Sequence, residues 1–240
     1  MRTSIHCAAV VLILIATTSA AAAQLTVTLD ANDYEVNFSN DGFHTMEMRG
    51  FSNISVPGKP LLPARVFTIA LPPGAEIISV DITSSSVTEL PGTYRIKPSP
   101  PIARCDNANP LLAGSGNDWA ENYESTYSSD AAYPQKVGQY MGAGQLRKYN
   151  FARVAFFPFS YHPQSGKLMY HRSCRVTINY SISTRYVTNP EDLERLLSDT
   201  VADHRASRLF VNFNAAKSWY APRRKNEPKQ THDYVIITDE

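Results

Sequence analysis

The segment Cys174-Arg175-Val176-Thr177-Ile178-Asn179-Tyr180-Ser181-Ile182 carries the clearest pattern in the chain. Small or apolar side chains alternate with polar ones along its whole length. Successive side chains of a β-strand point to opposite faces, so this period of two predicts a strand with one face in a core and the other in water. We therefore expect the body of the protein to consist of half-buried strands.

The same alternation of apolar and polar residues recurs at 25–29, 34–38 and 78–82. An apolar run at 151–159 is followed by turn residues at 161–166, which predicts a hairpin or meander that leads into the strand at 174–182. Many short strands joined by Pro- and Gly-rich connections are typical of an antiparallel β-sandwich. The expected fold class is therefore mostly β.

A short helix is predicted near residues 190–205. Pro190 suits the first helical turn, and either Thr188 or Asn189 precedes it as an N-cap. One apolar stripe of this helix would contain Leu193, Leu196, Leu197 and Val201. The pattern at 207–219 is compatible with more than one structure, so the sequence does not decide the secondary structure of this segment.

The last eight residues, Asp-Tyr-Val-Ile-Ile-Thr-Asp-Glu at 233–240, form a dense apolar and β-branched run. Such a run is typical of a strand that is buried on both faces, as in a parallel sheet covered by helices. The preceding residues 222–232 are basic, polar and proline-containing, as domain linkers are. We interpret 233–240 as the first strand of a truncated α/β domain; the alternative is an ordinary C-terminal edge strand.

The N-terminus has the three parts of a secretory signal peptide. Arg2 supplies the positive start, residues 7–16 the apolar core, and Ala21-Ala22-Ala23 the small-residue cleavage site. The apolar core is too short for a transmembrane helix, which needs about 20 residues. We expect export to the extracellular space or cell surface, with no membrane partner after the signal is removed. The formal net charge of +1 argues against nucleic acid as a partner.

These patterns together predict an ordered series of segments. The expected organisation is a signal peptide at 1–23, a β-sandwich core at 24–187, a helical C-terminal part of that domain at 188–221, a linker at 222–232 and the first strand of a second domain at 233–240.

Motifs of common enzyme sites are missing from the sequence. It has no Gly-rich phosphate loop, no zinc-type spacing of Cys or His and no Gly-x-Ser-x-Gly elbow. His162, His171 and Cys174 are close in sequence, but Cys174 falls on the apolar face of its strand and His162 in a turn. We therefore expect no catalytic residue, no metal and no cofactor in this chain. Cys105 and Cys174 are candidates for a disulfide in an oxidising compartment; alternatively, Cys174 is simply a buried small residue.

Four aromatic residues, Trp119, Tyr123, Tyr127 and Tyr133, lie close together in sequence. Aromatic side chains of this kind stack on sugar rings in carbohydrate-binding modules, or they pin a loop onto a sandwich. A secreted carbohydrate- or surface-binding module is therefore the alternative function.

A set of motifs, in a fixed order, carries a more specific signal. Gly58-Lys59-Pro60-Leu61-Leu62-Pro63 precedes a strand that ends in Pro72-Pro73-Gly74, and the turn at 161–166 leads into the strand at 174–182. With the signal peptide before them and the strand at 233–240 after them, these motifs resemble the N-terminal propeptide of gingipain-type cysteine peptidases. The resemblance covers roughly residues 25–240.

The resemblance implies a function for the chain. A propeptide of this family assists folding of the downstream caspase-like domain and keeps it latent by covering its cleft. The partner is therefore the cognate cysteine peptidase domain in cis. The parent precursor would be an endopeptidase whose catalytic His and Cys lie in that domain, so this chain alone has no peptidase activity.

The family also implies a basic side chain that blocks the cleft and a linker that is cleaved. The candidates for cleft blocking are Arg147, Lys148 and Arg185. The candidate processing site is Arg223-Arg224-Lys225, which would be exposed and basic; the alternative is a solvated linker without a processing role.

Overall fold

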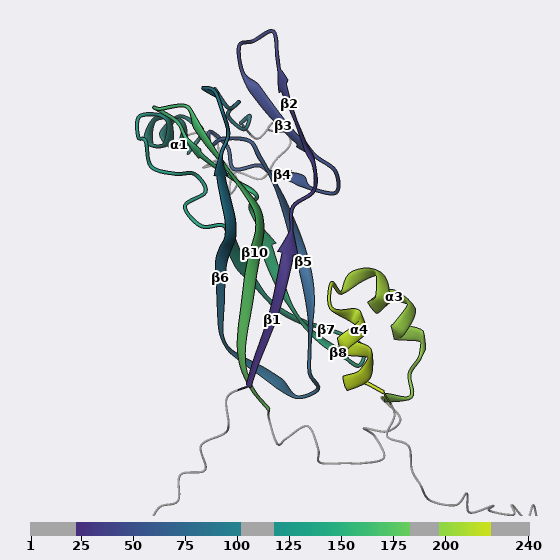
Figure 1. Cartoon of the computed structure of the whole chain (residues 1–240). Coiled ribbons are helices and arrows are strands. Elements are labelled where there is room, and N and C mark those ends of the chain that lie inside the picture. The colour runs from purple at the N-terminus through teal and green to yellow at the C-terminus, as the bar shows by residue number, and fades with distance from the viewer. Residues whose placement is uncertain (1–22, 102–117, 183–196, 222–240) are drawn as a thin grey trace, which may run out of the picture.

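The computed structural model describes residues 23–101, 118–182 and 197–221. Strands dominate these residues, and the helices are short (Figure 1). In chain order the elements are β1 (Ala23–Asp30), β2 (Tyr34–Phe38), β3 (His44–Met48), β4 (Ser52–Ile54), β5 (Leu62–Leu71), β6 (Ala75–Glu89), α1 (Asp118–Tyr127), β7 (Gly138–Leu146), β8 (Tyr149–Phe156), β9 (Phe159–His162), β10 (Lys167–Ile182), α3 (Val201–Leu209) and α4 (Phe213–Trp219).

Two antiparallel sheets form the body of the protein. In the first, β10 lies between β1 and β6 and also pairs with β9. In the second, the strand order is β4-β5-β8-β7. Figure 1 shows the long strands of both sheets running along the same axis. The predicted mostly-β, antiparallel fold is therefore confirmed.

The main core lies between the two sheets. Val176 and Ile178 of β10 face this core, as the alternation in the sequence predicted, and both are fully buried. Burying an aliphatic side chain of this size contributes about 1.5–3 kcal/mol. The other buried members are Leu29, Phe67, Ile69, Leu71, Ala152, Val154, Phe156 and Cys174.

The strand β6 departs from the simple alternation that its sequence indicates. Asn179 pairs with Ser79 but Tyr180 pairs with Ile77, so Ile78 is an extra residue in β6. This β-bulge changes which side chains point inward. Ile77 packs against the main core, whereas Ile78 is 61% exposed. The prediction that Ile78 shares the inner face is therefore wrong, because a register shift intervenes.

A second core lies at the end of the sandwich where the β2–β3 hairpin and α1 gather (Figure 1). The predicted hairpin is present there: β9 returns into β10, with His162 paired to Lys167. The buried residues of this second core are Met46, Met48, Leu62, Leu90, Ile96, Phe159, Tyr161 and Leu168.

The helices α3 and α4, which we call the helical unit, lie against the sandwich near β7 and β8 (Figure 1). Its buried residues include Ala202, Ala206 and Ala216, which pack with Tyr149 of β8 and Ala70 of β5. The sequence did not decide the secondary structure of 207–219. In the structure α3 ends at Leu209, and α4 follows it.

The predicted apolar stripe of the first helix is only partly correct. Leu197 is 6% exposed, but Val201 is 69% exposed. The reason is that α3 begins at Val201, whose backbone N–H donates to Asp199 Oδ1 at 3.0 Å. This local bond favours a helix start rather than a continuous helix, so Val201 does not continue the face of Leu197. The predicted Leu193 and Leu196 lie outside the described residues.

Candidate functional site

The tight turn between β7 and β8 contains two of the predicted cleft-blocking residues. Leu146 pairs with Tyr149, so Arg147 and Lys148 alone make the connection. Arg147 has a φ of 52°, which L-residues rarely adopt but which suits the twist of a two-residue hairpin. Gln145 Nε2 donates to the Arg147 carbonyl at 2.8 Å and helps to hold the turn.

Lys148 turns into the protein. Its residue is 2% exposed, and its Nζ lies 2.9 Å from Asp203 Oδ1 and donates to the Leu197 carbonyl at 3.1 Å. Tyr149 donates its hydroxyl to the same Asp203 oxygen at 2.8 Å. Two effects raise the pKa of Tyr149 and keep its hydroxyl protonated: burial is the larger, and this bond to the carboxylate is the smaller. A buried ammonium with these partners is poorly placed to enter another protein's cleft, which argues against Lys148 in that role.

Arg147 turns outward from the same turn. Its side chain is 52% exposed, and its Nη1 lies 3.1 Å from Asp199 Oδ2. An ion pair in contact with water contributes only about 0–1 kcal/mol, so the guanidinium can exchange this carboxylate for another at little cost. Two adjacent basic residues therefore differ in availability, and Arg147 is the accessible one.

The connection between α3 and α4 adds a second attachment to the sandwich. β4 pairs with only the first residues of β5, and further along, Val211 N–H donates to the Thr68 carbonyl at 3.1 Å. The Asn212 side chain both accepts from Ala70 N–H at 2.8 Å and donates to the Ala70 carbonyl at 2.9 Å. The segment therefore covers backbone groups that a bare edge strand would expose.

Tyr220 completes this attachment at the end of α4. Its hydroxyl donates to the Leu71 carbonyl at 2.8 Å and accepts from Asn150 N–H at 3.0 Å. None of these long-range bonds was expected from sequence. No pattern in the sequence identifies Asp199 and Asp203 as partners of Arg147 and Lys148.

Cys174 and the nearby histidines do not form a nucleophilic site. Cys174 is fully buried in the main core, and burial raises the pKa of its thiol to about 12. His171 has Ser84 Oγ 2.9 Å from Nδ1 and Ser160 Oγ 3.0 Å from Nε2, and burial lowers its pKa. His162 Nδ1 lies 2.8 Å from the Asp130 carbonyl. Each of these groups is held by packing or by a local hydrogen bond.

Three of the four predicted aromatic residues stack on one another, and Tyr133 packs against the second core. Trp119 and Tyr123 stack at 5.2 Å, and Tyr123 and Tyr127 stack at 4.6 Å. Trp119 Nε1 donates to the Ser99 carbonyl at 2.7 Å, and Tyr127 donates to the Ile96 carbonyl at 2.8 Å. The first three residues lie on α1 rather than in a loop, but they pin that segment to the sandwich. This arrangement favours a packing role over sugar binding.

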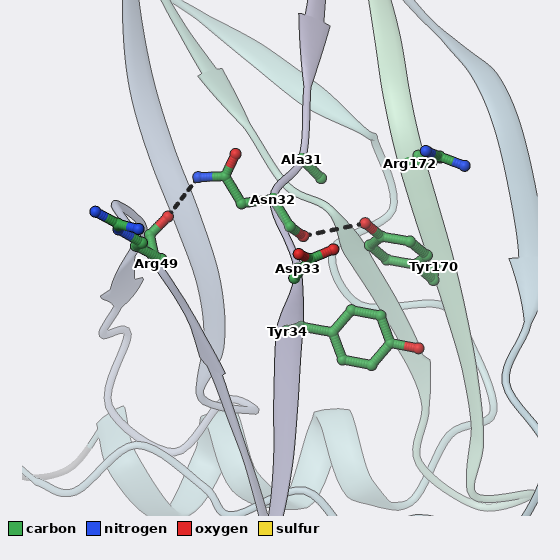
Figure 2. Close-up of a pocket in the computed structure, with 7 residues that line it drawn as sticks. All are labelled: Ala31, Asn32, Asp33, Tyr34, Arg49, Tyr170 and Arg172. Atoms are coloured by element: carbon green, nitrogen blue, oxygen red, sulfur yellow. Dashed lines mark hydrogen bonds between the residues drawn. The ribbon is translucent and has the colours of Figure 1, made fainter.

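A pocket of about 760 Å³ lies where β1 leads into β2 (Figure 2). Asn32 Nδ2 donates to the Arg49 carbonyl at 2.6 Å, and the Tyr170 hydroxyl donates to the Asn32 carbonyl at 3.2 Å. Figure 2 shows the guanidinium groups of Arg49 and Arg172 on opposite sides of the pocket, away from Tyr34. The lining contains no Cys, His or Ser and no convergent set of charged groups.

Other predicted site residues lie outside the described residues: Cys105, Arg185, Arg223, Arg224 and Lys225. The Cys105–Cys174 disulfide thus stays a prediction. Nowhere in the described ranges do three or more His, Cys, Asp or Glu residues gather to hold a metal. Among the same residues, no helix has the length and apolar content needed to cross a membrane.

The described residues thus form a two-sheet body to which a C-terminal helical unit is attached. The chain belongs to the Propeptide_C25 family, whose model matches residues 11–219. The prediction of a gingipain-type propeptide is thereby confirmed.

A solved structure shares this fold at low sequence identity. A complex of the pro- and mature domains of Porphyromonas gingivalis RgpB matches with a TM-score of 0.52 and 16% identity, covering 84% of this chain and 96% of that chain. A structure on the zymogenic latency of gingipain K from Porphyromonas gingivalis has a TM-score of 0.45 and 17% identity, covering 71% of this chain and 98% of that one. No curated protein matches the chain.

Proposed function

We propose that this chain is the precursor region of a secreted gingipain-type cysteine peptidase and that it keeps the downstream catalytic domain latent. The family match over residues 11–219 supports this proposal. The similar RgpB structure contains a pro-domain together with its mature domain, which supports a partner in cis. In this proposal the sandwich covers the substrate cleft and assists folding of the domain that follows.

The exposed position of Arg147 is the observation that supports a mechanism of cleft blocking. Its guanidinium projects from a two-residue turn, while Lys148 anchors that turn to Asp203. A basic group presented on a rigid support loses little conformational entropy when it binds. We therefore propose Arg147 as the cleft-blocking residue, with Arg185 as the other candidate.

Secretion and processing complete the proposal. Residues 1–23 direct export, residues 24–221 form the inhibitory domain, and cleavage at Arg223-Arg224-Lys225 separates it from the peptidase that begins near residue 233. Tyr220 bonds to β5 and β8, so the last described attachment of the domain lies directly before this linker, which supports a boundary there. N-terminal sequencing of the secreted peptidase tests the site; a start far from 223–233 contradicts it.

An inhibition assay tests latency. Residues 24–221 are produced separately and added to the active catalytic domain, and the inhibition constant is measured on a basic peptide substrate. We expect Arg147→Glu to weaken inhibition about 10- to 100-fold, the range for losing a central charged anchor. Arg208→Glu, an exposed arginine at the end of α3, is the matched control and should inhibit normally.

The same assay separates the alternatives. If Arg185→Glu loses inhibition while Arg147→Glu still inhibits as well as the wild type, the blocking residue is Arg185. If the wild-type domain does not inhibit at all, the latency proposal is wrong. Refolding yield of the catalytic domain with and without residues 24–221 tests the folding role.

A further inference from the structure

A second cavity, which we call the α1–β7 groove, has the features of a peptide-binding surface. It has a volume of about 750 Å³ and runs between α1, the β4–β5 connection and the first half of β7. Its apolar lining includes Pro60, Leu62, Pro63, Tyr133, Pro134, Met141 and Phe157. Grooves with mainly apolar walls and a few polar groups are typical binding sites.

The charges at this groove have one sign. Lys59 and Lys136 line it, whereas no Asp or Glu occurs among the described residues of its wall. Lys59 Nζ lies 5.6 Å from the centre of the Tyr133 ring, which holds the ammonium at the rim. Neither lysine forms an ion pair within the described parts of the chain. A partner that brings carboxylates would therefore meet unpaired positive charge.

The strand that forms one wall lies at a sheet edge. β7 is last in the order β4-β5-β8-β7, and its sequence Gly138–Leu146 contains no charged residue. Edge strands are commonly protected from pairing with another chain by charges, proline or β-bulges. β7 lacks the first two, and its bulge lies between Tyr140 and Ala143, which leaves Gly138–Tyr140 in regular pairing with β8. Gly138, Gln139 and Met141 line the groove, and Met141 is 43% exposed. The Met141 carbonyl already accepts from Arg153 Nη2 at 3.4 Å, so an extended segment would pair with the strand before the bulge and make its apolar contact with the Met141 side chain.

We propose that the α1–β7 groove binds an extended, acidic segment of the peptidase domain, which runs along β7 with an apolar side chain in the groove. The proposal rests on the proposed function for the identity of the partner. It assigns to the groove a binding role separate from blocking of the cleft by Arg147. The groove would increase the affinity of the complex without occupying the substrate site.

Binding measurements on the complex test this inference. Residues 24–221 bind an immobilised peptidase domain whose catalytic cysteine has been replaced, and the dissociation constant is measured at low and at physiological ionic strength. We expect Lys136→Glu to weaken binding about 5- to 10-fold, with a larger effect at low salt, because exposed charges are screened. Lys217→Glu on α4, another exposed lysine, is the matched control and should bind normally.

A second pair of variants tests the apolar contact. Met141→Gln should weaken binding several-fold, whereas Val211→Gln, at a residue that is 45% exposed outside the groove, should not. Hydrogen exchange adds a backbone readout: the amides of residues 138–141 should exchange more slowly in the complex than in the free propeptide.

The outcomes distinguish this inference from the proposed function. If the wild-type propeptide binds and inhibits, but the groove variants bind equally well and residues 138–141 gain no protection, the groove proposal is wrong and latency stands. If the groove variants weaken binding but the wild-type complex shows full peptidase activity with an intact cysteine, the latency proposal is wrong and the groove stands. No binding by the wild-type chain overturns both.

Discussion

The interior of the sandwich and the attachment of the helical unit are held together in different ways. The core between the two sheets is held by apolar contacts among buried residues of β5, β8 and β10, together with Leu29 of β1. The attachment of α3 and α4 adds polar bonds to its apolar contacts, including the Lys148–Asp203 ion pair and the paired bonds of Asn212 with Ala70.

This difference has a physical consequence. Apolar burial is nearly non-directional, so many hydrophobic side chains of suitable volume would maintain a core. A buried ion pair or a two-bond amide contact stabilises only one geometry, because any other position leaves a polar group without its partner. The helical unit is therefore set in one position, and that position fixes the turn that presents Arg147.

The largest expected effect comes from emptying the sandwich core. Phe156→Ala should lower the free energy of unfolding by about 3–5 kcal/mol, since Phe156 is fully buried and the change leaves a cavity. Phe38→Ala is the matched control, because Phe38 is 70% exposed on the β2–β3 hairpin. Urea denaturation measures both; equal losses would contradict the assignment of the core.

Breaking the buried ion pair should have the next largest effect. Lys148→Met leaves Asp203 without its ammonium, and we expect a loss of about 2–4 kcal/mol. Lys167→Met removes a pair with Glu89 at 3.7 Å in which both side chains are about half exposed, so it should cost under about 0.5 kcal/mol. Thermal unfolding compares the two variants. A small loss for Lys148→Met would show that the helical unit does not depend on this pair.

Removing the amide of Asn212 tests the attachment at β5. Asn212→Ala leaves the N–H and the carbonyl of Ala70 without this partner, and we expect a loss of about 1–3 kcal/mol. Hydrogen exchange should accelerate at Ala70 before it does in β10, because the helical unit opens locally. Asn214→Ala, at an exposed position on α4, should change neither quantity.

The pH dependence of unfolding provides a gentler comparison. Burial lowers the pKa of His171, so the unfolded chain binds a proton at this group at a higher pH than the folded protein does. Stability contributed by the neutral ring is present above about pH 6.5 and is lost as pH falls towards the lowered folded-state pKa. His171→Gln should make the free energy of unfolding depend less steeply on pH in this range, whereas His204→Gln at an exposed site should not. Chemical denaturation at a series of pH values measures the slope.

The smallest effect on stability is expected for Arg147→Gly. Arg147→Gly removes an exposed ion pair but also relieves a φ of 52°, so the two changes oppose each other and the net change should stay within about 0.5 kcal/mol. Arg147→Val should instead cost about 1–2 kcal/mol, because a β-branched residue disfavours this φ. Denaturant midpoints distinguish the two variants. Equal midpoints would contradict the turn geometry.

Much of the sandwich was predictable because its strands carry local signals. The alternation at 174–182 predicted β10, and the turn at 161–166 predicted the β9–β10 hairpin. The side chain of Ile78 was misassigned because a bulge depends on the partner strand and not on the period of its own sequence. The burial of Val201 was misassigned because a bond from Val201 N–H to Asp199 starts a new helix there.

The candidate site was less predictable. The sequence identified Arg147 and Lys148 as equivalent basic residues, but the fold turns one outward and buries the other. The aromatic residues near α1 were recognised as a cluster, whereas their mutual stacking follows from the helix that carries three of them.

By itself, the sequence determined that the chain forms antiparallel strands with one wet face and that it resembles gingipain-type propeptides. The first inference rests on patterns between near neighbours in the chain, and the second on the order of short motifs along it. Only the tertiary structure decided which basic residue is accessible, how α3 and α4 attach to β5 and β8, and where the α1–β7 groove lies. These features depend on pairs separated by up to 149 positions, such as Tyr220 and Leu71, whose contact is specified by the packing of the whole domain.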